Sequence, residues 1–259
     1  MTGDSDLRDR RDGGQAGFGR DSSSDSGAGC GVGRGGIRVA AVIPALNEAD
    51  AIASVVAGIR DLVDGVFVID DGSEDGTAER AAAAGAEVLR HERNAGKGHA
   101  VRTGLRRVMD ESFTHVLLLD GDMQHLPQEA KRLIEVAAET GADAVLGERV
   151  FFREQMPAAR YHANRLGSRV LSWFVGVRLN DTQCGYRLFR VDALRKIHLS
   201  ASGYEIETEM LVKITRRGGR LVSVPVTAVY GNERSKLRPV RDTTRTCFLA
   251  VYYRFLERV

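Results

Sequence analysis

The sequence has few cysteines, and its positive and negative charges nearly balance. The chain has 259 residues and three cysteines, Cys30, Cys184 and Cys247. They are too few and too far apart for a disulfide framework or a zinc site, so we expect free thiols in a reducing compartment. The formal net charge is only +2, which gives no overall basic field and argues against a nucleic-acid partner.

Long apolar runs are also absent from the sequence. No run approaches the roughly 20 apolar residues that a membrane-spanning helix needs. The N-terminus mixes acidic and basic residues, unlike a secretory signal. We therefore expect a cytoplasmic protein whose contact with a membrane is peripheral, on the inner face.

The first 36 residues differ in composition from the rest. Residues 1–36 are rich in Gly, Ser, Asp and Arg, and such a segment buries too little apolar surface to offset the entropy of ordering it. The glycines from Gly31 to Gly36 have the spacing of a dinucleotide fingerprint, but they precede the first expected strand, whereas a fingerprint follows one. We predict a disordered tail at 1–36, a folded domain at 37–242 and a C-terminal amphipathic helix at 243–259.

From Ile37 onward, short apolar runs alternate with stretches of helical periodicity. The expected strands are Arg38–Ile43, Val66–Ile69, Glu87–Leu89, His115–Leu119, Asp143–Leu146 and Leu221–Tyr230. The expected helices are Ala51–Asp61, Thr77–Ala84, Gly98–Asp110 and Gln128–Glu139. Continuous apolar strands such as Val116–Leu119 indicate burial on both faces. The pattern therefore predicts an α/β fold with a Rossmann-like, doubly wound and mostly parallel sheet.

Three polar clusters directly follow expected strands. They are Pro44–Glu48, Asp70–Ser73 and Asp120–His125. An isolated Asp-Gly is usually a turn, but the carboxyl ends of strands in one sheet open onto a shared crevice where ligands bind. We therefore predict that the three clusters line one site.

Asp120 and Asp122 are the sharpest pair in these clusters. Two carboxylates one residue apart at a strand end can share a hard cation, and Gln124 can add a neutral oxygen ligand. Such an ion would stabilise the negative charge that develops on a departing sugar diphosphate. The alternative is a turn leading into a helix with Pro127 at its first position, and both interpretations can hold together.

Asp70, Asp71 and Lys97 are candidate nucleotide contacts of another kind. Two adjacent carboxylates beside one ion are costly, so we expect Asp70 and Asp71 to accept hydrogen bonds from a base or ribose. The loop Asn94–Gly98 lacks the spacing of a P-loop. Its glycines permit close backbone approach, however, and Lys97 could meet a phosphate. The alternative for Lys97 is a solvated loop lysine.

Four motifs in this order resemble the family 2 glycosyltransferases. They are Val42–Glu48, Val68–Ser73, Asn94–Gly98 and Leu119–His125. Asp181–Phe189 and Ser235–Lys236 make the chain similar to the dolichyl- and polyprenyl-phosphate sugar synthases of that family. The resemblance implies a GT-A fold for the domain at 37–242, a Mg or Mn ion, and inversion at the anomeric carbon.

Together, the residues and the resemblance give each candidate a role. The expected nucleotide-sugar-binding residues are Pro44, Asn47, Glu48, Asp70, Asp71, Lys97, Asp120 and Gly121. The expected metal ligands are Asp120, Asp122 and Gln124. The resemblance implies that Arg149, Arg160 and Asn164 bind the acceptor, and Arg187 is a further expected acceptor-binding residue. The expected catalytic residues are Asp122, Arg149, Arg160 and Lys236, with Lys236 on a mobile loop that closes over the diphosphate.

The acceptor decides which further groups the chemistry needs. A lipid phosphate is largely a dianion at pH 7, so a polyprenyl or dolichyl phosphate needs arginines but no general base. A hydroxyl on a lipid, glycan or small molecule would need a carboxylate base, for which Glu207 is the candidate. The leading prediction is transfer of a hexose from UDP-glucose or GDP-mannose to a lipid phosphate. The Asp181–Gly185 sequence resembles the glucosyl branch of these synthases, which implies UDP-glucose. The alternatives are a hydroxyl-acceptor transferase, a nucleotidyltransferase and an inactive nucleotide-sugar-binding module.

Two segments carry the expected contact with a membrane surface. A helix from about Arg160 would place Trp173 on an apolar side and Arg165 and Arg169 on another, as in interfacial helices. The alternative is an ordinary surface helix that packs its apolar side on the domain. The C-terminal helix at 243–259 has a similar apolar face.

Overall fold

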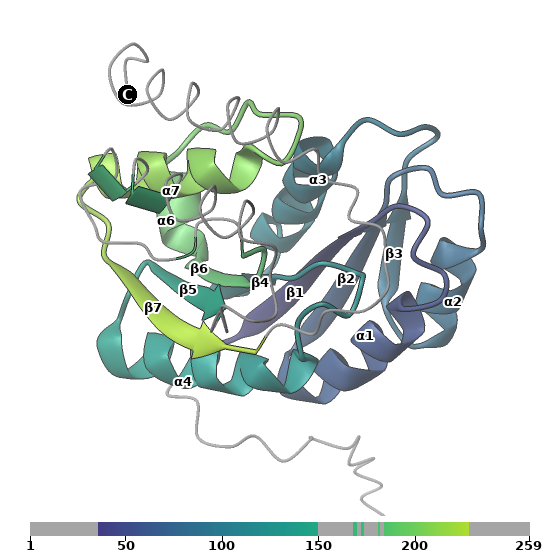
Figure 1. The fold of residues 1–259 in the computed structure, drawn as a ribbon, viewed down its shortest axis with the longest axis horizontal. Helices are drawn as coiled ribbons and strands as arrows, with labels where there is room; N and C mark the ends of the chain where they lie inside the picture. Colours follow the sequence, from purple (N-terminus) through teal and green to yellow (C-terminus); the bar gives the residue numbers. More distant parts are fainter. Residues whose placement is uncertain (1–35, 150–167, 170–171, 174–180, 182–183, 228–259) are drawn as a thin grey trace, which may run out of the picture. The chain divides into compact units, whose positions relative to one another are not determined.

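In the described part of the chain, the sheet has seven strands in the order β3-β2-β1-β4-β6-β5-β7 (Figure 1). The computed structural model describes residues 36–149, 168–169, 172–173, 181 and 184–227. The strands are β1 (Val39–Ala45), β2 (Gly65–Asp70), β3 (Glu87–Arg90), β4 (His115–Leu118), β5 (Ala144–Arg149), β6 (Arg187–Arg190) and β7 (Leu221–Val226). Strands β1 to β4 pair in parallel, as do β5 and β7, whereas β6 is antiparallel to both neighbours. The predicted α/β fold with a mostly parallel sheet is confirmed.

Strand β6 is an element that the sequence does not predict, as are the helices at Val191–Arg195 and Ile206–Arg216. Only Leu188 and Phe189 are apolar between the arginines that bound it, which is too short a run to indicate a strand. The register places Leu188 between Leu117 of β4 and Val145 of β5. Long-range pairing in the middle of the sheet therefore makes this strand.

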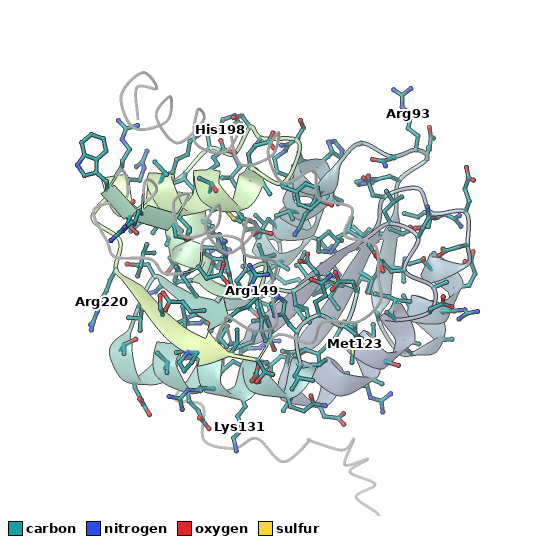
Figure 2. The ribbon with its side chains drawn as sticks, viewed as in Figure 1. Arg93, Met123, Lys131, Arg149, His198 and Arg220 are labelled. Atoms are coloured by element: carbon teal, nitrogen blue, oxygen red, sulfur yellow. The ribbon has the colours of Figure 1, made fainter. Side chains whose placement is uncertain are left out.

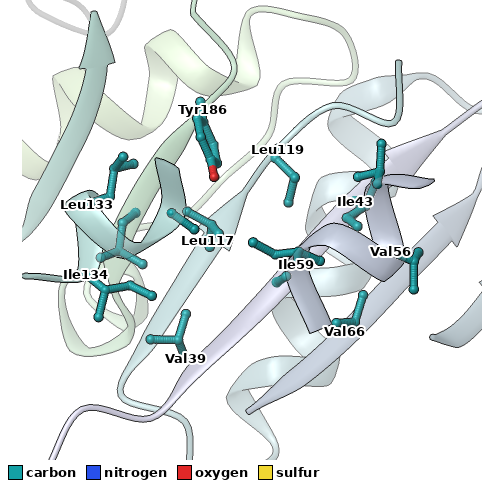
Figure 3. Packing of buried hydrophobic residues seen from close by; sticks show 14 of the residues in the cluster. Val39, Ile43, Val56, Ile59, Val66, Leu117, Leu119, Leu133, Ile134 and Tyr186 are labelled. Atoms are coloured by element: carbon teal, nitrogen blue, oxygen red, sulfur yellow. The ribbon is translucent and has the colours of Figure 1, made fainter. Parts of the chain in front are cut away.

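Helices cover both faces of the sheet (Figure 1). They are α1 (Ile52–Ile59), η1 (Arg60–Leu62), α2 (Thr77–Ala83), α3 (Lys97–Met109), η2 (Pro127–Glu129), α4 (Ala130–Thr140), α6 (Val191–Arg195) and α7 (Ile206–Arg216). Alternate residues of β1 enter different cores: Ile43 packs with α1, α2 and α4, while Val42 packs with α3, α6 and α7. Figure 3 shows the first of these cores, in which Leu133 and Ile134 of α4 lie near Val39 and Leu117. The period-two alternation of strand side chains produces this three-layer arrangement.

Gly104 lets α3 approach the sheet closely. A Cβ atom at this position would lie 2.4 Å from Cγ1 of Val42 and 3.2 Å from Cγ1 of Ile69. Glycine inside a helix lowers helix stability by about 1 kcal/mol relative to alanine. The close contact with the sheet explains why glycine nevertheless occurs at this position. The approach fixes the position of the N-terminus of α3, which carries Lys97.

Three predicted segments fall mainly outside the described residues. They are the tail at 1–36, the helix from about Arg160 and the helix at 243–259. Trp173 belongs to the second segment and is 72% exposed. Among the helices that the structure describes, none is long and apolar enough to cross a membrane. These segments stay predictions.

Candidate active site

A cleft opens at the carboxyl ends of β1, β2, β4 and β5. Its volume is about 560 Å³, which suits a small-molecule ligand. The residues that line it include Pro44, Asn47, Glu48, Asp71, Lys97, Asp120, Gly121, Asp122, Gln124, His125, Arg149 and Tyr204. Members of all three predicted clusters therefore meet in one crevice.

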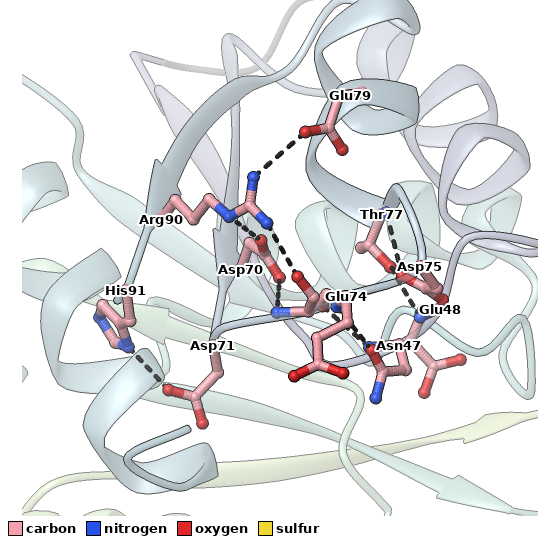
Figure 4. A network of polar contacts seen from close by, with 11 residues as sticks. Asn47, Glu48, Asp70, Asp71, Glu74, Asp75, Thr77, Glu79, Arg90 and His91 are labelled. Carbon is pink, nitrogen blue, oxygen red and sulfur yellow. Dashed lines mark hydrogen bonds and ion pairs between the residues drawn. The ribbon is translucent and has the colours of Figure 1, made fainter. Parts of the chain in front are cut away.

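The loops that follow β1 and β2 form one wall of the cleft, and hydrogen bonds from backbone N–H groups to side chains hold them together (Figure 4). Asn47 has a left-handed φ of 52°, which is uncommon outside glycine and often marks a functional site. Its N–H donates to Ser73 Oγ at 2.9 Å, and its Oδ1 accepts from the N–H of Glu74 at 3.1 Å. The N–H of Glu48 donates to Thr77 Oγ1 at 2.9 Å. These bonds fix the positions from which Asn47 and Glu48 face the cleft.

Asp71 ties the end of β2 to the loop before α3. Its Oδ1 accepts from the N–H of Ala95 at 3.0 Å, and its Oδ2 accepts from the N–H of Gly96 at 2.8 Å. His91 Nδ1 lies 2.7 Å from Asp71 Oδ1, and its Nε2 lies 3.1 Å from Thr103 Oγ1. Asp71 thus lines the cleft and also orders the loop that precedes Lys97.

Asp70 lies behind this wall. Its side chain is fully buried, and its Oδ1 accepts from the N–H of Ser73 at 3.0 Å. Its Oδ2 lies 3.2 Å from Nε of Arg90. Asp70 is not among the described residues that line the cleft, so its position does not support the predicted contact with a nucleotide. The carboxylate instead fixes the turn after β2.

The glycines beside Lys97 accommodate protein backbone. A Cβ atom at Gly96 would lie 2.4 Å from the carbonyl oxygen of Ser202, and one at Gly98 would lie 2.5 Å from that of Ala201. Gly96 also has a φ of +99°, which favours glycine. The close approach expected of these glycines is therefore made by the 201–202 loop, to which the N–H of Gly98 donates at 2.9 Å.

Lys97 lies between two carboxylates rather than in solvent. Its Nζ is 2.6 Å from Asp120 Oδ1 and 2.7 Å from Glu207 Oε1. Burial alone would lower the pKa of the Lys97 ammonium, but the carboxylates of Asp120 and Glu207 outweigh burial and hold that pKa above its ordinary value. Lys97 is therefore a permanent positive charge in the wall of the cleft.

The two carboxylates of the β4 loop have opposite pKa shifts. Burial would raise the pKa of Asp120, but Lys97 outweighs it and holds this pKa below its ordinary range. Burial raises the pKa of Asp122 to about 6, and the negative charges of Asp120 and Glu48 contribute. Asp122 is thus a buried carboxyl with two further carboxylates near it, and its ionised form is disfavoured without a partner cation.

The donor set fits a hard divalent ion. Asp122 Oδ1 accepts from the N–H of Gln124 at 3.0 Å, and Met123 between them has a left-handed φ of 58°. Asp120, Asp122 and Gln124 all line the cleft, and carboxylate and amide oxygens of this kind suit Mg or Mn. Among the described residues, no cluster of three or more His, Cys, Asp and Glu is arranged to hold an ion.

Gly185 leaves space for Asp120. A Cβ atom at Gly185 would lie 2.4 Å from Asp120 Oδ2. The side chain of Asp120 is thus confined by Lys97 on one oxygen and by the backbone before β6 on the other. The glycine of the Asp181–Phe189 motif has a packing role that the sequence alone does not indicate.

Arg149, labelled in Figure 2, is the last residue of β5. It is one of the residues that line the cleft. Its Nε lies 2.6 Å from Asp181 Oδ2, and its Nη2 lies 3.0 Å from Asp181 Oδ1. The side chains of Arg149 and Asp181 are only 9% and 1% exposed. A two-point pair of this kind fixes the plane of the guanidinium, so Asp181 orients Arg149 in the wall. The sequence indicated Asp181 only as part of a motif.

Glu207 and Arg187 form a second buried pair at the start of α7. Arg187 Nη2 lies 3.4 Å from Glu207 Oε2, and its Nη1 donates to the carbonyl oxygen of Glu207 at 3.0 Å. The Arg187 side chain is 1% exposed, and the residue is not among the described residues that line the cleft. Its position does not support direct contact with an acceptor, and it instead holds Glu207 from behind.

His125 is a cleft residue to which the sequence gave no role. Its ring stacks on Tyr186 with a centroid distance of 5.5 Å, and its Nε2 lies 3.7 Å from Cys184 Sγ. Burial lowers the pKa of His125, and the positive charge of Arg149 contributes. The ring is therefore neutral, and it supports the loop that carries the acidic pair.

Several predicted site residues lie outside the described residues. They are Arg160, Asn164 and Lys236. Their roles stay predictions, as do the roles of the described candidates that line the cleft.

The sheet order, the antiparallel β6 and the acidic pair at the end of β4 define a class of protein. They are the features of a glycosyltransferase with a GT-A fold. The family follows from the sequence: the family model described as "Glycosyl transferase family 2" matches residues 40–198, and the chain belongs to this family.

Relatives and solved structures agree with this assignment. The chain is 35% identical to glycosyltransferase AglJ of Haloferax volcanii, over 83% of this chain and 71% of the relative. It is 34% identical to the undecaprenyl-phosphate mannosyltransferase of Micrococcus luteus, over 74% of this chain and 84% of the relative. Glucosyl-3-phosphoglycerate synthase of Mycobacterium tuberculosis, in complex with Mn²⁺ and UDP-glucose, is similar in structure. The TM-score is 0.68 at 25% identity, covering 85% of this chain and 79% of the other.

Proposed function

We propose that this family 2 glycosyltransferase transfers a hexose from UDP-glucose or GDP-mannose to a polyprenyl or dolichyl phosphate, with inversion and with a Mg or Mn ion. The observation that carries the proposal is that one cleft holds both an acidic pair and a fixed arginine. Asp120 and Asp122 follow β4, and Arg149 ends β5. A cation site beside an anion-binding guanidinium suits a reaction between two phosphate-bearing substrates.

The names of the relatives support both substrates. The Micrococcus protein is named for undecaprenyl phosphate and mannose, and a further relative, from Haloferax volcanii, is named dolichyl-phosphate hexose transferase. The Mycobacterium structure was determined with Mn²⁺ and a nucleotide sugar. These names leave both donor sugars open for this chain.

We assign the donor nucleotide to predicted residues that line the cleft. Pro44, Asn47, Glu48, Asp71 and Gly121 line it, and we assign them to the nucleotide. A divalent ion held by Asp120, Asp122 and Gln124 would supply positive charge to the diphosphate leaving group.

The acceptor end is assigned to Arg149, with Arg160, Asn164 and Lys236 as further predicted contributors. A phosphate acceptor is already ionised, so it needs orientation and charge neutralisation rather than a base. The described carboxylate that could serve as a base is Glu207, and its two oxygens face Lys97 and Arg187 at 2.7 and 3.4 Å. This pairing favours the phosphate acceptor over a hydroxyl acceptor. A lipid acceptor also requires contact with a membrane surface, which we assign to the predicted helices at about 160–177 and 243–259.

A donor and acceptor screen tests the proposal. The full chain would be incubated with Mn²⁺ or Mg²⁺ and each nucleotide sugar, in the presence of a short polyprenyl phosphate or the matched polyprenol. We expect release of nucleoside diphosphate and a glycosylated lipid only with the phosphate. Equal transfer to the polyprenol would instead support the hydroxyl-acceptor alternative, and the absence of any product from all nucleotide sugars would contradict the proposal.

A further inference from the structure

Four charged side chains of alternating sign form a row that begins in the wall of the cleft and continues into the protein behind it. They are Asp120, Lys97, Glu207 and Arg187. Lys97 Nζ contacts Asp120 at 2.6 Å and Glu207 at 2.7 Å, and Arg187 Nη2 contacts the other oxygen of Glu207 at 3.4 Å. The row joins the end of β4 to the starts of α3, α7 and β6. It is more than a set of surface pairs, because Lys97, Glu207 and Arg187 are 14%, 10% and 1% exposed.

The Lys97 ammonium occupies a position that the proposed ion needs. It lies against Oδ1 of Asp120, a carboxylate that we assign to the ion. Two cations at one carboxylate oxygen repel strongly where water is largely excluded. Ion binding and the Lys97–Asp120 contact therefore compete.

Glu207 offers Lys97 a position away from Asp120. The same Nζ atom already contacts Glu207 Oε1, so a small movement of the ammonium can break one ion pair and keep the other. Arg187 holds Glu207 in place through its carboxylate and its carbonyl oxygen. A buried ammonium without a partner is unfavourable in free energy. Glu207 remains as the partner of Lys97 when the ion binds Asp120, so this penalty is avoided.

We propose that Glu207 is a positioning residue that retains Lys97 when a divalent ion takes Asp120. The inference rests on the ion site in the proposed function. In the ion-free protein, Lys97 neutralises Asp120. In the loaded protein, it stays in the wall of the cleft on Glu207, beside the expected position of the diphosphate. Glu207 acts through Lys97 and not as a base.

Binding of Mn²⁺ in the absence of donor tests the exchange. The full chain would be titrated with Mn²⁺, and free Mn²⁺ would be followed by its electron paramagnetic resonance signal. Lys97→Met removes the competing cation and is expected to tighten Mn²⁺ binding about tenfold, whereas Glu207→Gln leaves Lys97 on Asp120 and is expected to weaken it about tenfold. A general loosening of the cleft would weaken binding in both variants.

The double variant separates exchange from a simple effect of charge. When Lys97 is already methionine, Glu207→Gln is expected to change Mn²⁺ affinity less than about twofold, because no ammonium remains to be held. Equal weakening by Glu207→Gln in both backgrounds overturns the proposal. The proposal is also overturned if Lys97→Met binds Mn²⁺ more weakly than the wild type while its melting curve without ion is cooperative, because a cooperative curve shows that the variant is folded.

Two controls keep the result interpretable. If Lys97→Met does not fold, Glu207→Asp is measured in its place. Glu207→Asp keeps the negative charge that pairs with Lys97, so it is expected to bind Mn²⁺ more tightly than Glu207→Gln. Equal Mn²⁺ affinities of Glu207→Asp and Glu207→Gln overturn the proposal. If the wild-type chain binds no Mn²⁺ with or without UDP or GDP, the ion site and the exchange both fail. If it binds Mn²⁺ but the coupling is absent, only the exchange fails.

Discussion

Arg149 and Asp181 form a two-point ion pair at the end of β5, although they are 32 residues apart in sequence. The guanidinium Nε and Nη2 each face one oxygen of the carboxylate, at 2.6 and 3.0 Å. Arg149 lines the cleft and Asp181 is 1% exposed. A buried carboxylate thus sets the direction of the cation that we assign to the acceptor phosphate.

Loss of this pair should weaken the acceptor more than the donor. Asp181→Asn removes the charge that orients Arg149, and we expect the KM for polyprenyl phosphate to rise about tenfold or more, with donor affinity nearly unchanged. Breaking a buried pair also costs about 3–5 kcal/mol of stability. Steady-state kinetics and urea unfolding would measure the two effects. Asp192→Asn is the control, since Asp192 pairs with Arg195 at 3.5 Å on an exposed surface.

A methyl group at Gly185 should displace Asp120. The added Cβ of Gly185→Ala would lie 2.4 Å from Asp120 Oδ2, so the carboxylate must turn away. We expect Mn²⁺ affinity and turnover each to fall at least about tenfold, while circular dichroism shows an intact fold. Wild-type Mn²⁺ affinity in this variant would show that the position of Asp120 is not critical.

Ion binding should depend on pH through Asp122. Its pKa is raised to about 6, and the ion requires the ionised form. Mn²⁺ affinity should therefore be constant above pH 6 and fall about tenfold per pH unit below it. Calorimetry between pH 5 and 8 would measure this slope, and a flat profile would count against Asp122 as a ligand.

The raised pKa of Asp122 also affects how the stability of the ion-free protein changes with pH. A carboxyl whose pKa is higher in the folded state than in the unfolded chain favours folding when protonated, so its contribution declines as the pH rises from about 4 to about 6. Asp122→Asn should remove this decline and melt at a higher temperature than the wild type at pH 7 without ion. A lower melting temperature for Asp122→Asn under these conditions would contradict the shift.

Glu209 should matter for folding rather than for chemistry. Its fully buried carboxylate accepts from the N–H groups of Ser200 and Ala201 at 2.9 and 2.8 Å and pairs with Lys213 at 2.8 Å. These bonds hold the loop that packs on Gly96 and Gly98. We expect Glu209→Gln to cost about 3–5 kcal/mol in urea unfolding. Glu135→Gln, which disrupts an exposed pair with Lys131 at 3.9 Å, should cost less than about 0.5 kcal/mol.

Much of the fold follows from local sequence pattern. The segments that form β1, β2 and β4 each contain an uninterrupted apolar stretch, and α3 and α4 show helical periodicity, so their positions are predicted within a few residues. Strand β6 escapes prediction because its identity comes from pairing with β4 and β5 rather than from its own residues.

The cleft is predictable where its residues follow strands directly. Asn47, Asp71 and Asp120 meet because parallel strands end at one edge of a sheet. What the sequence does not reveal is which polar groups pair with each other. Asp70 and Arg187 satisfy buried partners and do not line the cleft. The roles of Asp181 and Gly185 also depend on contacts between distant segments, and such contacts leave no local pattern.

The dependence of turnover on a divalent ion tests the central claim most directly. Release of nucleoside diphosphate from UDP-glucose and GDP-mannose would be measured with a short polyprenyl phosphate, in Mn²⁺, Mg²⁺ or EDTA, for the wild type and for Asp122→Ala. We predict that EDTA and the substitution each lower turnover at least about 100-fold, and that added ion restores only the wild type. Turnover that is unchanged in EDTA, or undiminished in a folded Asp122→Ala variant, would contradict the account.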